Sequence, residues 1–181
     1  VERQGSGSAV APARTKVEQS LSRLTSCTED MARRGFKSGV EWLERGLVVP
    51  SPEEVLALGL RAGDPVARLS RLRKADDRPM AIERATLPHD VLPDPSEVTQ
   101  SLYDVLGRHG KRPVRAVQKI SAVNLTEADA KLLGLPPGAA GLRIERTSYL
   151  PGGRVIEFTR SLSRGDAYDF VPELRLPGAL T

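Results

Sequence analysis

The chain has few of the residues that small catalytic and metal-binding domains use. Its 181 residues include one cysteine and two histidines, so a disulfide framework is excluded and a structural zinc site is not expected. Aromatic residues make up 4%, so aliphatic side chains must fill the core. Apolar runs long enough to span a membrane and a secretory signal sequence are both lacking. These absences indicate a cytoplasmic protein with no metal or other cofactor.

What is present predicts a domain of ordinary size. Hydrophobic residues account for 39% of the chain, enough for a real core, and the net charge of +4 favours anionic partners only weakly. The common motifs of nucleotide, zinc and redox sites (the P-loop, GxGxxG, HExxH and CxxC) are missing. The chain begins at Val1 and not at a methionine, which suggests that the sequence continues upstream.

One sequence pattern occurs twice, 75 residues apart. Ser51–Gly63, SPEEVLALGLRAG, returns as Thr126–Gly138, TEADAKLLGLPPG. Single residues follow the same spacing: Arg68 and Arg71 return as Arg143 and Arg146, and Ser26 and Gly35 return as Ser101 and Gly110. The repeat is too long for a solenoid and has only two copies. It predicts a pseudo-symmetric domain, and ligand sites often form where such halves meet.

Each copy predicts the order helix, strand, helix and β-hairpin. In the first copy we expect helices over 27–34 and from Pro52 to Gly59 or Gly63, and strands over 40–49, 65–74 and 79–87. In the second we expect helices over 99–109 and from Thr126 to near Gly134, strands over 113–124, 140–150 and 154–164, and a short last strand near Phe170. Ser51 and Glu54 form a capping box, with Pro52 at the first helical position. The class is α+β, with about six core strands in a mixed or antiparallel sheet.

Arginines lie on the apolar face of two predicted strands. Alternate residues of a strand share a face, so Ala67 and Leu69 lie on the same side as Arg71 and Arg73, whereas solvated arginines would lie opposite, with Arg68. The second copy repeats the arrangement with Leu142, Ile144, Arg146, Ser148 and Leu150 on one side. An arginine on an apolar face needs an anionic partner, because an unpaired buried charge is costly.

Two interpretations of these arginines stay open. In the first, they pair within the protein with Glu83 and Glu157 on the returning strands. In the second, Arg71 and Arg73 hold a phosphate or carboxylate, which guanidinium groups bind well. The helix start at Ser26–Thr28 would add backbone N–H groups and hydroxyls to such an anion site. Cys27 as a nucleophile and the two glutamates as an acid–base pair are less favoured, because no sequence feature places the required partners nearby.

Several segments resemble one protein family. These segments are Leu24–Met31 (LTSCTEDM), Arg71–Glu83 (RLRKADDRPMAIE), Ser101–Tyr103 (SLY) and Glu145–Tyr149 (ERTSY). In this order they are similar to the UTRA effector-binding domain, the C-terminal domain of the HutC branch of GntR-type bacterial transcription regulators. The similarity covers about residues 21–175, and Val1–Ala11 resembles the last strand of the wing in that family's winged helix-turn-helix.

The resemblance implies a division into three parts. Residues 1–20 would be the end of the wing and the interdomain linker, 21–175 the effector-binding domain, and 176–181 a C-terminal tail. From composition alone, residues 1–20 could equally be a flexible tail. The implied fold is chorismate-lyase-like: a mostly antiparallel six-stranded sheet with packed helices, built from two pseudo-symmetric αβαββ units. The implied protein is a cytoplasmic homodimer and not an enzyme, and it reads operator DNA through an upstream winged helix.

The resemblance also implies a ligand and its site. The LTSCTEDM segment is most similar to the subgroup that senses phosphorylated amino sugars such as N-acetylglucosamine 6-phosphate. The residues carried over to this chain are Ser26, Cys27 and Thr28 with Arg71 and Arg73 for the phosphate, Ser101 and Tyr103 at its border, and Glu83 and Glu157 for the sugar or for fixing the arginines. Two departures leave the sugar open: Cys27 replaces a bulkier aromatic residue, and Ser163 stands where a tyrosine is expected. A chorismate-lyase-type enzyme that acts on an anionic substrate is the alternative function, and an interaction domain with internally paired arginines is a third.

Overall fold

The computed structural model describes residues 17–19, 23–172 and 174. The helices are α1 (Cys27–Arg33), α2 (Pro52–Leu58), the 3-10 helix η1 (Pro95–Glu97), α3 (Leu102–Arg108) and α4 (Glu127–Leu133). The strands are β1 (Val17–Gln19), β2 (Ser38–Val48), β3 (Val66–Ala75), β4 (Arg78–Pro88), β5 (Arg115–Asn124), β6 (Ala140–Tyr149), β7 (Val155–Arg164) and β8 (Tyr168–Phe170).

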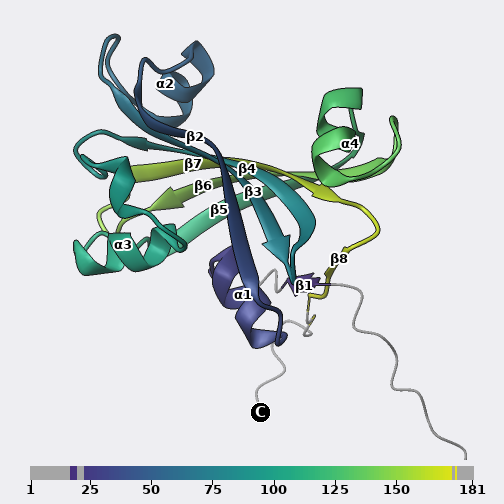
Figure 1. The fold of residues 1–181 in the computed structure, drawn as a ribbon. Helices are drawn as coiled ribbons and strands as arrows, with labels where there is room; N and C mark the ends of the chain where they lie inside the picture. Colours follow the sequence, from purple (N-terminus) through teal and green to yellow (C-terminus); the bar gives the residue numbers. More distant parts are fainter. Residues whose placement is uncertain (1–16, 20–22, 173, 175–181) are drawn as a thin grey trace, which may run out of the picture.

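The main sheet has six strands in the order β2-β3-β4-β7-β6-β5, and every neighbouring pair is antiparallel. The two hairpins β3-β4 and β6-β7 meet at its centre, so the halves of the repeat join along β4 and β7. A second, small sheet pairs β1 with β8 in parallel. Figure 1 shows the strands of the main sheet crossing the middle of the molecule. The predicted α+β class with a six-stranded, mostly antiparallel sheet is confirmed.

Local signals account for most element boundaries. Ser51 and Glu54 form both hydrogen bonds of the capping box at the start of α2, and Gly59 ends that helix in the left-handed conformation, with φ of 64°. Between β3 and β4, Asp76 and Asp77 have φ of 48° and 64°. Two successive positive values are typical of the tight turn that suits the twist of a hairpin. The predicted hairpin of the strands over 65–74 and 79–87 is therefore confirmed.

Three parts of the fold differ from the prediction or lie outside the described residues. Helix α3 begins at Leu102 and not near residue 99, because the Ser101 hydroxyl accepts the Asp104 N–H at 3.3 Å and caps the helix there. Strand β1 and the 3-10 helix η1 were not predicted. The predicted wing strand over residues 1–11 and the tail over 176–181 lie outside the described residues, so the domain limits stay predictions.

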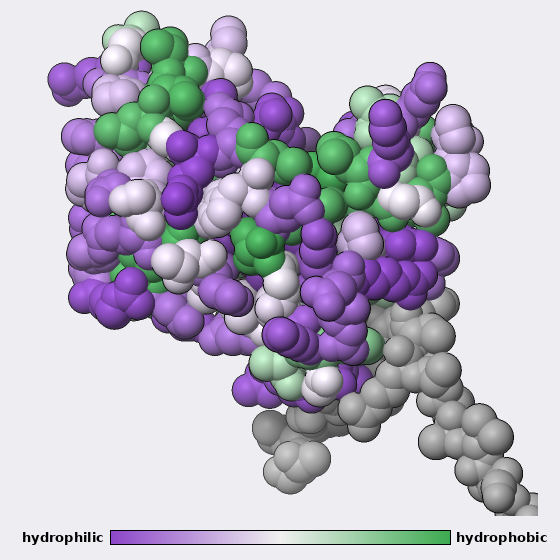
Figure 2. Space-filling view, viewed as in Figure 1, coloured by the Kyte–Doolittle hydropathy of each residue, from purple (hydrophilic) through white to green (hydrophobic). Residues whose placement is uncertain are grey.

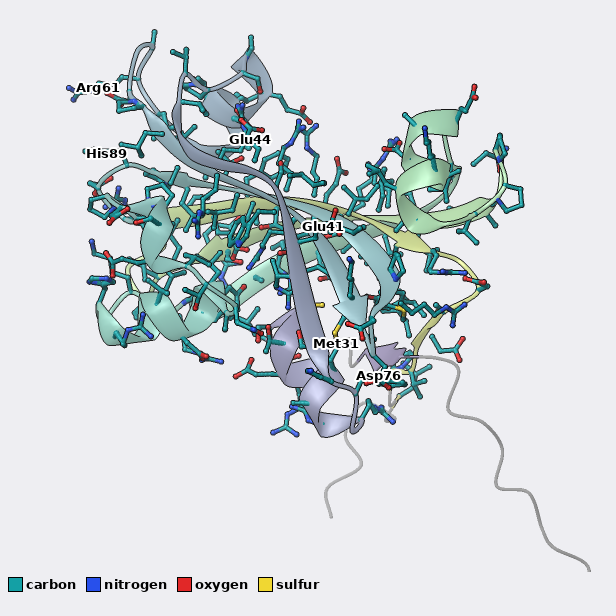
Figure 3. The ribbon with its side chains drawn as sticks, viewed as in Figure 1. Met31, Glu41, Glu44, Arg61, Asp76 and His89 are labelled. Carbon is teal, nitrogen blue, oxygen red and sulfur yellow. The ribbon has the colours of Figure 1, made fainter. Side chains whose placement is uncertain are left out.

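Helices lie on both faces of the sheet. Helices α1 and α3 lie on one face, and α2 and α4 lie at opposite ends of the other (Figure 1). Figure 3 shows the same division in side chains, with Glu44 on the α2 side and Met31 on the α1 side. The largest apolar cluster, which includes Leu69, Leu87, Val98 and Leu106, packs between the sheet, α3 and the segment before α3. The other face has only small clusters, one under α2 and one under α4.

Candidate functional site

A polar cavity lies between the sheet and the starts of α1 and α3. All nine residues predicted for a ligand site line it: Ser26, Cys27, Thr28, Arg71, Arg73, Glu83, Ser101, Tyr103 and Glu157. The two helix starts are related by the 75-residue repeat, and Ser26 and Ser101 are the N-caps of α1 and α3. The structure therefore brings the predicted residues together at the place where the two halves meet. Their role in binding stays a prediction.

Arg71 is held by an internal ion pair. Its side chain is buried, one terminal nitrogen contacts the Glu83 carboxylate directly across the β3-β4 ladder, and the other donates to the Gln100 carbonyl at 3.1 Å. The guanidinium carbon also lies 5.7 Å from the centre of the Trp42 ring. The interpretation that the arginines pair within the protein is thus correct for Arg71. The Nε of Arg71 is buried and has no partner among the described residues.

Arg73 is more deeply buried and has no such carboxylate. It is 1% exposed, and its terminal nitrogens donate to the Thr28 hydroxyl at 2.6 Å and the Gln100 carbonyl at 3.2 Å. No carboxylate lies within ion-pair distance of it in the part of the chain that the structure describes. Its Nε is likewise buried without a partner there. Neutral oxygens do not cancel a buried positive charge, and the nearby Glu83 carboxylate, whose charge Arg73 feels, is ion-paired with Arg71. Arg73 is therefore a buried guanidinium group without a carboxylate of its own.

The start of α1 contributes hydroxyl and thiol groups to the cavity wall. The Ser26 hydroxyl accepts the Glu29 N–H at 3.1 Å, while the Glu29 carboxylate accepts the Ser26 N–H at 2.7 Å. This capping box fixes the helix start, so the Ser26 hydroxyl is already engaged. Burial raises the pKa of the Cys27 thiol, although the positive charge of Arg73 opposes that shift. Cys27 is therefore held as a neutral thiol, which makes it a poor nucleophile.

A hydrogen-bonded network forms the opposite wall. The buried Glu157 carboxylate accepts the Tyr103 hydroxyl at 2.9 Å and the Thr159 hydroxyl at 2.6 Å, and the Tyr103 and Ser148 oxygens lie 3.3 Å apart. Burial, together with the negative charge of Glu157, raises the pKa of Tyr103. Glu157 does not pair with an arginine among the described residues, so the expected Arg–Glu pairing is absent in the second half. Its role here is to orient Tyr103.

Nine further lining residues were not predicted as site residues, and four of them carry polar groups that matter for the cavity: Gln118, Arg146, Thr159 and Tyr168. Arg146 donates to the Gln118 side chain at 3.0 Å and to the Thr25 carbonyl at 3.1 Å. A signal for Arg146 was present, because it repeats Arg71 and shares the apolar face of its strand. Tyr168 had no such signal, since it comes from β8, outside both copies of the repeat.

The cavity carries a surplus of positive charge. Three guanidinium groups face two carboxylates among its lining residues, a difference of one. Burial alone would raise the pKa of Glu83, but the charges of Arg71 and Arg73 outweigh it and hold that pKa below its usual value. The glutamate is thus ionised at neutral pH, and the surplus charge favours an anionic ligand.

The size of the cavity limits what it holds in this conformation. Its water-accessible volume is about 60 Å³. A buried water needs about 10–15 Å³ on this measure, so there is room for roughly four waters. An ion or a single phosphoryl group fits this space, whereas a larger ligand requires the walls to move apart. Neither His89 nor His109 lines the cavity, and no cluster of metal-ligating side chains occurs among the described residues.

Comparisons with known proteins agree with the fold. The UTRA domain family matches residues 33–169. The chain is 36% identical over 159 residues to the HTH-type transcriptional repressor NagR of Bacillus subtilis, which covers 86% of this chain and 65% of NagR. It is 32% identical to the HTH-type transcriptional repressor PhnF of Mycolicibacterium smegmatis, over 94% of this chain and 70% of PhnF. The crystal structure of PhnF superposes with a TM-score of 0.81 at 28% identity, covering 96% of this chain and 77% of that one.

The chain therefore belongs to the UTRA domain family, and the resemblance found in the sequence is confirmed. Its relatives in the comparisons are helix-turn-helix transcription regulators. The chain spans less than two-thirds of the length of NagR. No helix among the described residues is both long enough and apolar enough to cross a membrane.

Proposed function

We propose that this chain is the effector-sensing part of a cytoplasmic, homodimeric transcription regulator that reads operator DNA through an upstream winged helix. In this proposal the cavity binds a small phosphorylated metabolite, with N-acetylglucosamine 6-phosphate or a related sugar phosphate as the best candidate. Ligand binding would change operator affinity by shifting the population of two conformations, which requires unequal affinity for the two. The names of the curated relatives and the family membership support the regulatory role.

The observation that carries the proposal is the buried Arg73. A 1% exposed guanidinium group with no carboxylate at ion-pair distance in the described chain is costly, and a protein that keeps it needs a compensating anion. Arg71 lies two residues away on the same face, so two guanidinium groups converge on one small space. A phosphoryl group suits this arrangement, because it fills about the space of four waters and has several oxygens that accept hydrogen bonds from guanidinium groups.

The remaining lining residues suit the rest of a sugar phosphate. With the phosphoryl group at Arg71 and Arg73, Ser101, Tyr103, Glu83 and Glu157 border the space where the sugar would extend. Because the cavity is too small for the whole ligand, the sugar would enter only when the α1 and α3 starts move away from the sheet. The ligand would then bind the opened conformation of the protein more tightly than the closed one. This unequal affinity is what regulation by a ligand requires.

Tyr168 offers a path from the cavity to the upstream segment. Its buried side chain lines the cavity, and its backbone pairs with Val17 of β1. A ligand that displaces this side chain would act on β8 and thereby on β1, the described strand nearest the start of the chain. Through Tyr168 and the pairing of β8 with β1, ligand binding would thus be connected to the part of the chain that would lead to the DNA-binding domain.

Isothermal titration with N-acetylglucosamine 6-phosphate tests the assignment. We expect Arg73→Ala to weaken binding by about 1–3 kcal/mol, or about 5- to 150-fold, the scale of losing a charge-assisted hydrogen bond. The matched control is Arg84→Ala, because Arg84 is an exposed arginine on the other face of the sheet and should leave binding unchanged. Equal affinity of the wild type and Arg73→Ala would show that the phosphate assignment is wrong.

The enzyme alternative has a direct test. A chorismate-lyase-type activity would release pyruvate from chorismate. We expect no pyruvate, since the curated relatives are transcription regulators. Pyruvate formation that Arg73→Ala abolishes would replace the regulatory proposal by an enzymatic one.

A further inference from the structure

One buried arginine joins the starts of α1 and α3 from inside the cavity. Arg73 donates to the Thr28 hydroxyl in the first turn of α1 at 2.6 Å, and to the Gln100 carbonyl just before α3 at 3.2 Å. We call this pair of contacts the inner bridge. Because Arg73 and Thr28 line the cavity, a bound anion can replace these oxygens as the partner of the guanidinium group. The inner bridge is therefore exchanged, and not simply lost, when a ligand enters.

A second arginine joins the same two helices from outside. Arg112 follows α3, and one of its terminal nitrogens donates to the Glu29 carboxylate in the first turn of α1 at 2.7 Å. Its guanidinium carbon lies 5.6 Å from the centre of the Tyr103 ring in the first turn of α3, within the range of a cation–π contact. We call these two contacts the outer bridge. Neither Arg112 nor Glu29 lines the cavity, so a ligand that binds there does not replace the outer bridge.

Both ends of the outer bridge are attached to the cavity wall. Glu29 accepts the N–H of Ser26, a lining residue, at 2.7 Å. Tyr103 lines the cavity itself and donates to the Glu157 carboxylate at 2.9 Å. Burial would raise the pKa of Glu29, but the hydrogen bonds from Ser26 and Arg112 outweigh it and hold that pKa below its usual value. The glutamate is therefore ionised at neutral pH, and its contact with Arg112 is an ion pair.

The backbone on both sides of Arg112 is fixed to α3 and to the main sheet. The Lys111 N–H donates to the Leu106 carbonyl of α3 at 2.7 Å, and the Val114 N–H donates to the Tyr149 carbonyl of β6 at 3.0 Å. Arg112 therefore extends from an anchored segment to α1, which is only seven residues long. The gap between the first turns of α1 and α3 cannot widen unless the outer bridge breaks.

The outer bridge is weak enough to be broken by a ligand. The side chains of Arg112 and Glu29 are 42% and 36% exposed, and the surface over α1 and α3 is mostly hydrophilic (Figure 2). An exposed ion pair changes an equilibrium by at most about fivefold, and an exposed cation–π contact changes it by about two- to fivefold. The outer bridge therefore favours the closed cavity without making it permanent.

We propose that Arg112 is the latch of the effector cavity: it holds the first turns of α1 and α3 together from outside, and a ligand enters between them when the Arg112–Glu29 pair separates. This inference rests on the proposed function, because it concerns access to the same cavity, and it adds a residue that sets how often the cavity opens. Removal of Arg112 raises the population of the open form even when no ligand is present.

Reaction of Cys27 with methyl methanethiosulfonate measures this opening without any effector. Cys27 is the only cysteine of the chain and lines the cavity, and the uncharged reagent transfers its methylthio group to the thiol. We expect Arg112→Ala to be labelled about 3- to 30-fold faster than the wild type in intact-protein mass spectrometry, the scale of losing an exposed ion pair together with a cation–π contact. Loss of a nearby positive charge would by itself slow the reaction of a thiol, so faster labelling reports opening.

Arg154→Ala is the matched control. Arg154 forms an exposed ion pair with Asp90, also at 2.7 Å, and neither residue lines the cavity, so labelling should proceed at the wild-type rate. Glu29→Gln keeps an acceptor for the Ser26 N–H but removes the charge that faces Arg112, and should speed labelling about 2- to 5-fold. The double variant of Arg112→Ala with Glu29→Gln should be labelled no faster than Arg112→Ala, because both changes act on one contact.

The outcomes separate the latch from the effector assignment. Equal labelling of the wild type and Arg112→Ala would overturn the inference, and so would equal acceleration by Arg112→Ala and Arg154→Ala. An acceleration no larger than the change in the global unfolding equilibrium, measured in urea, would also overturn it. If Arg112→Ala is labelled faster but no sugar phosphate binds, the latch stands and the effector assignment fails. If a sugar phosphate binds but the labelling rate is unchanged, the effector assignment stands and the latch fails.

Discussion

The two faces of the central sheet use arginine in opposite ways. On the cavity face, Arg71 and Arg73 are 3% and 1% exposed. On the opposite face, which α2 and α4 flank, Arg84 and Arg143 are exposed, although Arg84 lies on the strand that pairs with β3. Because successive residues of a strand point to opposite faces of the sheet, a shift of one position decides whether a guanidinium group is exposed to solvent or buried and in need of a counter-charge. The difference shows that burial, and not residue type, decides which arginines need a counter-charge.

Arg68 adds a third case to this comparison. It lies on the face opposite the cavity, and yet its side chain is largely shielded from solvent. Its side chain is 16% exposed and pairs with the buried Glu54 of α2 at 2.6 Å. The prediction that arginines opposite the apolar face are solvated is therefore wrong for Arg68. Helix α2 covers that end of the sheet and supplies a carboxylate.

The largest expected effect comes from removing this carboxylate. Glu54 accepts two bonds from Arg68, one from the Thr86 hydroxyl and one from the Ser51 N–H. Glu54→Ala leaves Arg68 without its buried partner and should lower the free energy of unfolding by about 3–5 kcal/mol in urea denaturation. The control, Glu53→Ala, removes an exposed pair with Arg160 and should cost at most about 1 kcal/mol. Equal losses in the two variants would break the distinction between buried and exposed charge.

A smaller effect distinguishes the two arginines of the cavity. Arg71→Met strands the ionised Glu83 and should cost about 3 kcal/mol of unfolding free energy. Arg73→Met strands no carboxylate and removes a buried charge, which offsets its lost hydrogen bonds, so the unfolding free energy should fall by no more than about 1 kcal/mol. Thermal and urea unfolding of the ligand-free variants measure the difference. If Arg73→Met were the more destabilising of the two, Arg73 would have a structural partner, and the case for an external anion would be lost.

The smallest effect concerns pH. The folded-state pKa of Glu83 is lowered, because the charges of Arg71 and Arg73 outweigh the effect of burial. The stability that Glu83 contributes is therefore present above its unfolded pKa, about 4.3, and is lost as the pH falls through the folded value. We expect the melting temperature to fall more steeply below about pH 4 in the wild type than in Glu83→Gln. Identical pH profiles would mean that the Arg71–Glu83 pair contributes nothing to stability.

Sequence reasoning predicted the sheet and half of the residues that line the cavity, because both depend on short-range rules. Strand alternation put Arg71 and Arg73 on the apolar face, the capping box of Ser51 and Glu54 located α2, and the family resemblance placed Glu83 and Glu157 beside the arginines. The repeat related Ser26 to Ser101, and in the structure these residues are the N-caps of α1 and α3, although the second helix was predicted to begin near residue 99. These features need only local geometry and one internal comparison.

Other features depend on tertiary contacts that the sequence does not display. Strand β8 is three residues long, and its pairing with β1 joins segments that are about 150 residues apart. Tyr168 consequently enters the cavity from a direction that no pattern indicated. The partners of Arg73 could not be predicted either, because Gln100, whose carbonyl accepts a hydrogen bond from Arg73, lies in a loop outside the helices and strands.

The duplication also bears on the direction in which a ligand would lie. Arg71 and Arg146 are equivalent residues of the two copies, one on β3 and one on β6, and both line the cavity. Arg73 has no such twin, since Ser148 occupies its place in the second copy. A cavity with two-fold related walls would accept a molecule either way round, and Arg73 removes that ambiguity. The lone arginine makes one end of an otherwise balanced cavity more positive than the other, and under the proposed function this asymmetry would favour one orientation of a ligand that is charged at one end.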